Sequence, residues 1–242
     1  MPHFTWKEDD MAHSLLFFPF VGAVIGALIC LVNLPVAAAR LPVAVRILLT
    51  LAIPLIITGG IHVDGFLDTE DALHSYASMH RKLEILKDPH VGAFALISFL
   101  KWILILGAAI SAILLNARTD FKMLLIFGLS FVVTRCLSGL TSLLFRKAKT
   151  DGMLYEETKK QSTAIFFLGV QLLVSGTLMV YLNALCGALL LLALGLFTCC
   201  YRHRTYKEFG GVTGDTAGYY LTVCELLGAV ILAAWGGISQ MF

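Results

Sequence analysis

The chain has 242 residues, of which 58% are hydrophobic and only 14% are charged, with a formal net charge of +2. Soluble domains are about 45–50% apolar and about 25% charged, so eighteen basic and sixteen acidic residues are too few to coat a soluble fold of this size. The composition therefore excludes an ordinary soluble protein, and the small net charge gives no indication of nucleic-acid binding.

The N-terminal segment differs from a cleavable secretory signal. Its first thirteen residues carry three acids and Lys7, where a signal peptide would have a basic region. We therefore expect the first apolar run, which starts at Ser14, to remain as a membrane anchor.

Seven apolar runs follow, most of them close to the roughly 20 residues that a helix needs to cross a bilayer. They are Leu15–Asn33, Val43–Thr58, Ala93–Leu115, Phe121–Phe145, Ala164–Tyr181, Ala184–Cys200 and Tyr219–Trp235. We predict an all-α fold, a polytopic membrane protein with about seven transmembrane helices in a single domain over residues 1–242. The six cysteines lie in or beside these runs without CxxC spacing, so we interpret them as packing residues.

The basic residues between these runs indicate an orientation. With the N-terminus inside, the inner loops are 1–13, 59–92, 146–163 and 201–218, and they hold twelve Lys and Arg against four on the outer side. Cytoplasmic loops carry such an excess. We therefore predict a cell inner membrane protein with a cytoplasmic N-terminus. Nearly all acidic residues and all histidines fall on the inner side, which favours an active site there.

The most informative loop is Thr58–Tyr76, which reads TGGIHVDGFLDTEDALHSY. If it is helical, Asp64, Asp68 and Asp71 lie within about 60° of arc, and Glu70 points elsewhere. Three carboxylates on one stripe repel one another unless a cation neutralises them, and such hard oxygen ligands suit Mg²⁺. Glycines at 59, 60 and 65 would let backbone approach a phosphate closely. The alternative is a solvated acidic face on a loop helix.

Three ionisable residues lie within the predicted spans, namely Lys101, Arg135 and Glu225. Each would cost about 2.5–3.5 kcal/mol at a helix centre, so we expect each to face the bundle interior with a partner. Glu225 could pair with Arg135 or Lys101. We favour Lys101 as its partner, with Arg135 contacting a substrate phosphate.

Two further loops on the inner side carry candidate binding residues. The segment after Phe145 is basic and starts with Arg146; it either sets topology beside lipid headgroups or binds a leaving nucleotide. The segment Phe209–Gly218 reads FGGVTGDTAG just before the last apolar run. Glycine-rich backbone at a helix N-terminus is a ready anion site, and Asp215 there could cap the helix or join a metal site.

These blocks resemble the cobalamin synthase family. The run Gly59–Leu73 is similar to its GGxHxDGxxDxxD signature, and Gly210–Gly218 is similar to its GGxTGDxxG block. Four other segments resemble family blocks in the same order along the chain, namely Phe18–Gly26, Lys87–Leu96, Thr134–Leu140 and Phe145–Leu154. The chain departs from the family at Thr222, where a Glu is common.

The resemblance implies a transferase that joins GDP-activated cobinamide to α-ribazole or its 5′-phosphate with release of GMP. It implies Mg²⁺ as cofactor, with ligands at Asp64, Asp68, Asp71 and Asp215. The candidate general bases are Asp71, Asp215 and His62. We expect substrate contacts from Gly60, Gly65, Lys87, Arg135, Arg146, Gly211, Thr213 and Gly214. The expected partners are these substrates and membrane lipid, and a homo-oligomer is compatible with the sequence.

Two other classes of protein compete with this interpretation. A membrane phosphotransferase of the CDP-alcohol type also uses an Asp stripe centred on DG, but its DGxxAR continuation is absent, because FLDT follows Asp64-Gly65. A secondary transporter would place its buried charges near the midplane in paired halves, and the sequence has no such symmetry.

Overall fold

The structure, a computed structural model, describes residues 8–116, 121–148, 158 and 162–238. In this part of the chain it contains no β-strand, only an isolated bridge between Lys147 and Val212. Its helices are α1 (Glu8–Val32), α2 (Pro35–Ala38), α3 (Val43–Thr58), α4 (Ile61–His74), α5 (Met79–Ile85), α6 (Ala93–Leu115), α7 (Phe121–Leu144), α9 (Ser162–Leu182), α10 (Ala184–Phe209) and α11 (Gly214–Ile238).

Among the described residues, six helices are each long and apolar enough to cross a membrane, and α3 with α4 forms a seventh candidate that is bent by 91°. The prediction of an all-α polytopic membrane protein is confirmed. We treat α4 as lying outside the spanning segments, because its fourteen residues include four carboxylates. Each of the seven predicted runs falls on a helix.

Two of these helices extend beyond the apolar runs. α10 continues past Cys200 to Phe209, and α11 starts at Gly214 rather than at Tyr219. A helix can be longer than its apolar run, because only the part in contact with lipid must be apolar, whereas the helix itself ends where the backbone conformation changes. Here the change comes at Gly210, whose φ of 78° ends α10 in a left-handed cap.

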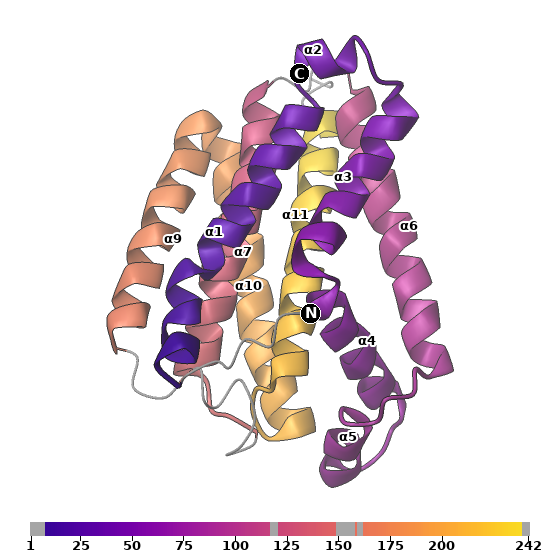
Figure 1. Cartoon of the computed structure of the whole chain (residues 1–242), viewed down its shortest axis with the longest axis vertical. Coiled ribbons are helices and arrows are strands. Elements are labelled where there is room, and N and C mark those ends of the chain that lie inside the picture. The colour runs from indigo at the N-terminus through magenta and orange to yellow at the C-terminus, as the bar shows by residue number, and fades with distance from the viewer. Residues whose placement is uncertain (1–7, 117–120, 149–157, 159–161, 239–242) are drawn as a thin grey trace.

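Helix α11 lies in the middle of the bundle (Figure 1), with α4 and α6 on one side and α7 and α10 on the other. Helix α1 packs along α7, and α9 lies beside both. Helices α4 and α5 and the turn between α10 and α11 gather at one end of the molecule, opposite α2 (Figure 1). The described parts of the predicted inner loops 59–92, 146–163 and 201–218 therefore meet at one end (Figure 1).

The contact between α1 and α7 depends on small residues. A Cβ added at Gly26 would lie 2.5 Å from the carbonyl oxygen of Gly128, and one at Gly22 would overlap the backbone of Phe131. The two helix backbones thus touch directly, as membrane helices do where glycines recur every four residues.

The charges within the spans are arranged differently from the prediction. Arg135 is fully buried on α7, and its Nη1 lies 2.9 Å from Oε1 of Glu225 on α11. The preference for Lys101 as the partner of Glu225 is wrong, and so is the expectation that Lys101 faces the interior, because Lys101 is exposed on α6. A long lysine side chain can remain on the lipid side by extending toward the headgroups.

Candidate active site

Two consecutive glycines separate α3 from α4. Helix α4, which carries the acidic residues, is bent by 91° relative to α3 at this break. Gly59 and Gly60 have φ angles of 63° and 80°, which glycine adopts without steric cost. The N–H of Asp64 then donates to the carbonyl of Gly60 (2.9 Å) in the first turn of α4. A Cβ at either glycine would meet no atom within 4 Å, so the backbone at the turn stays accessible.

Helix α4 packs directly on the start of α11. A Cβ added at Gly65 would lie 2.7 Å from the carbonyl oxygen of Asp215, and one at Gly218 would lie 2.9 Å from that of His62. Thr222 donates from Oγ1 to the same His62 carbonyl (3.1 Å). Gly65 therefore has a packing role, which brings the acids of α4 beside Asp215.

The carboxylates that the sequence predicts as metal ligands influence one another. The pKa of Asp68 is raised to about 6, first because the group is partly buried and then because Asp64, Asp215 and Asp71 lie near it. Burial and like charge both disfavour the charged form. The structure thus brings the four acids into one neighbourhood at the α4–α11 contact.

The side chains do not form a ready cage for a metal. Within the described residues, no group of three or more His, Cys, Asp or Glu is placed to hold one ion. Mg²⁺ usually keeps several waters and takes only one or two carboxylates plus substrate phosphates. A pair of mutually repelling carboxylates beside an accessible backbone turn fits that requirement.

Asp71 has partners of its own. Its Oδ2 accepts from the N–H of Gly92 (2.5 Å) and its Oδ1 accepts from the N–H of Ala95 (2.8 Å), both at the start of α6. Of the three aspartates on the predicted stripe, Asp71 is thus directed toward α6.

Glu70 points away from the stripe, as predicted. It is buried on α4 and accepts a hydrogen bond from Oγ of Ser98 on α6 (2.6 Å). His74, one turn later, stacks on Phe94 with ring centroids 5.4 Å apart. The C-terminal half of α4 is therefore fixed to α6. Ser98 could not be predicted from the sequence, because only the packing of α4 on α6 brings it to Glu70.

Thr213, not Asp215, caps α11. The N–H of Thr216 donates to Oγ1 of Thr213 (3.1 Å), and the N–H of Thr213 donates to Oγ1 of Thr216 (2.8 Å). This reciprocal pair is a capping box with Thr in place of the usual Glu. Asp215 lies in the first turn of α11, and its Oδ2 accepts from Oγ1 of Thr213 (3.4 Å).

Gly211 and Arg146 join two loops beside this cap. The N–H of Val212 donates to the carbonyl of Arg146 (2.8 Å), and a Cβ at Gly211 would overlap that backbone. Arg146 donates from Nε to the carbonyl of Gly210 (2.7 Å), and its guanidinium lies 5.0 Å from the ring centroid of Tyr206. Tyr206 was not among the residues predicted from the sequence. Gly214 has open space where a Cβ would be.

His62 and Arg135 lie close to each other and to Phe18 of α1. The pKa of His62 is lowered to about 4, first by burial and then by the nearby Arg135, so this imidazole is neutral at pH 7 and a weak base. The Phe18 ring contacts both residues, with its centroid 5.7 Å from that of His62 and 5.9 Å from Cζ of Arg135.

Lys87 lies outside this group of residues. It is exposed in the turn after α5, where its N–H donates to the carbonyl of Glu84 (2.9 Å). The structure gives it no position at the α4–α11 contact.

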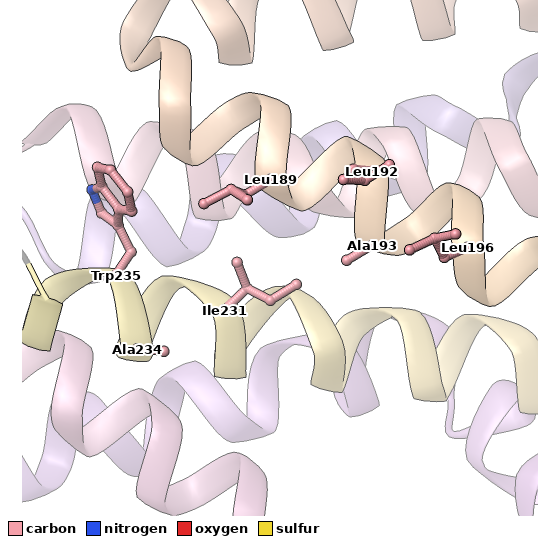
Figure 2. A pocket seen from close by; sticks show the side chains of 7 residues that line it. All are labelled: Leu189, Leu192, Ala193, Leu196, Ile231, Ala234 and Trp235. Atoms are coloured by element: carbon pink, nitrogen blue, oxygen red, sulfur yellow. The ribbon is translucent and has the colours of Figure 1, made fainter.

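A cavity of about 300 Å³ lies elsewhere, between α10 and α11. Figure 2 shows that its lining is apolar, with Leu189, Leu192 and Leu196 on α10 facing Ile231 and Trp235 on α11. It contains none of the predicted site residues, and the three leucines are exposed at the surface of the bundle. A lipid-facing groove accounts for it, so the acidic region remains the candidate site.

Comparison with known proteins gives one consistent result. The family model described as cobalamin-5-phosphate synthase matches residues 1–233. A protein of Lachnoclostridium phytofermentans named adenosylcobinamide-GDP ribazoletransferase is 36% identical, over 96% of this chain and 88% of its own length.

Relatives with the same name occur in other bacteria. One from Listeria monocytogenes is 36% identical over 87% of this chain and 82% of its own length. One from Clostridium perfringens is 30% identical over 96% and 91%. No solved structure matches this chain significantly.

Proposed function

The chain belongs to the cobalamin-5-phosphate synthase family, and from this membership we infer its reaction. It is a membrane transferase that joins GDP-activated adenosylcobinamide to α-ribazole or its 5′-phosphate and releases GMP, the final step in assembling the nucleotide loop of cobalamin. The observation that carries this conclusion is the match over almost the whole chain, which includes both the acidic block on α4 and the glycine-rich turn before α11.

We propose Mg²⁺ as the cofactor, held by Asp64, Asp68 and Asp215. The proximity of these carboxylates at the α4–α11 contact supports the proposal, since their mutual repulsion is relieved by a divalent cation. When bound, such an ion stabilises the charge that develops on a diphosphate as the leaving oxygen departs. The predicted fourth ligand, Asp71, is directed instead toward the start of α6.

The residues around the acids would orient the two substrates. A hydroxyl of the acceptor attacks the phosphorus attached to the corrinoid side chain, and GMP leaves from the opposite side. Open backbone at Gly60 and Gly214 allows close approach of phosphate oxygens. We propose Asp215 as the base, through the oxygen that does not hold the ion, because Asp71 already accepts two hydrogen bonds and His62 is largely buried beside Arg135.

The other residues predicted from the sequence would contact the substrates in different ways. Arg146, next to the cap of α11, and Thr213 would contact the phosphates, and Gly211 holds their loops together. Arg135 would contact the substrate phosphates while paired with Glu225. Lys87 would contact the substrate only if the turn after α5 moved toward the α4–α11 contact.

For the cellular setting we propose the cytoplasmic membrane, with the N-terminus and the acidic site on the cytoplasmic side. The excess of basic residues in the loops on that side supports this orientation. Lipid surrounds the spans, and a homo-oligomer is compatible with the exposed apolar faces.

Membranes that contain the protein provide the direct test. With GDP-cobinamide, α-ribazole and Mg²⁺ they should release GMP, and they should be inactive with a CDP-alcohol donor. Activity with the CDP-alcohol alone would favour the other class of membrane phosphotransferase.

A further inference from the structure

Helix α6 starts without a capping side chain of its own. Its N-cap residue is Gly92, which has no side chain to accept the usual cap hydrogen bond. The first N–H groups of a helix lack partners within the helix and need acceptors from elsewhere. In this structure the acceptor is Asp71, which belongs to α4.

The geometry is that of a cap supplied by another helix. The two oxygens of Asp71 accept from the N–H groups of Gly92 and Ala95, the N-cap residue and the third residue of the helix. A Cβ at Gly92 would lie only 2.6 Å from the Asp71 carboxylate oxygens. Glycine at this position is therefore what allows the carboxylate to reach the backbone.

Electrostatics favour this arrangement over metal binding by Asp71. A carboxylate is stabilised at a helix N-terminus, which carries the positive end of the helix dipole. The same positive end disfavours a divalent cation on that carboxylate. The hydrogen bond between Ser98 and Glu70 adds a second point of attachment further along α6 (2.6 Å).

We propose that Asp71 is a positioning residue, which caps α6 and thereby fixes α4 so that Asp64 and Asp68 face Asp215. It is then not a metal ligand or base, although it belongs to the same acidic stripe. The claim about metal rests on the proposed function, whereas the claim about the cap does not.

The test compares Asp71→Asn and Gly92→Ala with Asp64→Asn, which changes an acid of the proposed metal site. Ser98→Ala serves as the control, because it changes the same interface and leaves the cap in place. For each purified protein we would measure the melting temperature with and without Mg²⁺, then kcat, KM for the donor and the Mg²⁺ concentration for half-maximal GMP release.

Asp71→Asn should melt about 2–4 °C lower without Mg²⁺ and should still be stabilised by Mg²⁺ at concentrations within about twofold of wild type. Its kcat should fall about 10-fold or more because the site is misplaced, while KM changes little. Gly92→Ala should show the same changes. The double variant should melt no lower than the less stable single variant, because both substitutions remove the same contact. Asp64→Asn should lose the Mg²⁺ response without melting lower.

Two results would overturn the proposal. One is an Asp71→Asn protein that melts like wild type. The other is an Asp71→Asn protein that loses the Mg²⁺ response while Gly92→Ala keeps it, which would make Asp71 a ligand. If the wild-type protein itself neither responds to Mg²⁺ nor releases GMP, the proposed function fails. The melting temperatures and the double variant then still decide whether Asp71 is the cap.

Discussion

At the scale of single residues, burial and three acidic neighbours disfavour the charged form of Asp68 and raise its pKa to about 6. Asp68→Asn keeps the size of the side chain and removes this repulsion. The variant should therefore melt no lower than wild type in the absence of Mg²⁺, yet its turnover should fall by orders of magnitude because a charged oxygen ligand is lost.

The measurement is GMP release across a Mg²⁺ titration, beside thermal unfolding in detergent. Glu84→Gln is the matched control, since it removes one exposed carboxylate on α5 that, within the described residues, pairs only with Arg81 and His80 of its own helix. Near-normal turnover of Asp68→Asn at limiting Mg²⁺ would mean that the acidic stripe is only a solvated face.

The ion pair between Arg135 and Glu225 gives a second prediction at this scale. Among the described residues, Nε and Nη2 of the buried Arg135 make no hydrogen bond, so the guanidinium depends on Glu225 and the carbonyl of Phe131. Breaking a buried pair costs about 3–5 kcal/mol. Glu225→Gln should lower the melting temperature strongly, and adding Arg135→Gln should restore part of it.

Lys101→Gln is the control for this experiment, because Lys101 is also a charge within a span but is exposed. It should change the melting temperature little. A double variant that melts no higher than the worse single variant would contradict a stabilising role for the pair.

At the scale of helices, the contact of α1 with α7 is the one most sensitive to an added methyl group. Gly26→Ala would bring a Cβ within 2.5 Å of the Gly128 carbonyl oxygen, so the helices must separate. Overpacking of this kind typically costs about 1–3 kcal/mol. We expect a lower melting temperature in detergent and a lower yield of folded protein.

Gly169→Ala on α9 is the matched control, since an added Cβ there meets nothing within 4 Å. In a helix interior, Ala is intrinsically more stable than Gly by up to about 1 kcal/mol, so this variant should melt at or above the wild-type temperature. Equal melting of the two variants would show that the close packing of α1 on α7 contributes little.

The helices themselves could be predicted from the sequence, because an apolar run of about 20 residues has few alternatives to a membrane helix. Contacts between helices could not. The acidic block was recognised from spacing, but the attachment of Asp71 to α6 requires knowing that α6 starts beside α4. For the same reason the sequence could not assign Gly65 to packing, or choose Arg135 rather than Lys101 as the partner of Glu225.

At the scale of the whole molecule, the arrangement of the helices puts the candidate site at one end. Helix α11 runs through the centre and contacts α4 near its start, and α5 and the turn before α11 lie at the same end (Figure 1). The ion pair of Lys82 on α5 with Glu208 on α10 fixes this end further. The candidate site therefore lies at one end of the helix bundle (Figure 1).

Which side of the membrane this end faces can be decided by labelling with a membrane-impermeant maleimide. Of the native cysteines, four are buried and only Cys199 and Cys200 are exposed, so replacing these two with Ser gives a suitable background. Single cysteines would then be introduced at His90, which is 88% exposed and lies near the start of α6, and at Val36 on α2, which is 67% exposed.

Helix α2, which contains Val36, lies at the end of the bundle opposite α5 (Figure 1). The two positions must therefore react from opposite sides of a membrane that the spans cross. Because basic residues are retained in the cytoplasm, we expect Val36→Cys to react in intact cells and His90→Cys to react only after permeabilisation. Gly237→Cys, near the end of α11, should behave like Val36→Cys, since the six crossings between them (α3, α6, α7, α9, α10 and α11) return the chain to the same side. Labelling of His90→Cys in intact cells would invert the topology and place the acidic site outside the cytoplasm, where GDP-activated substrates would not reach it. Protection of Gly237→Cys together with labelling of Val36→Cys would instead mean that α3 and α4 enter and leave the membrane on the same side.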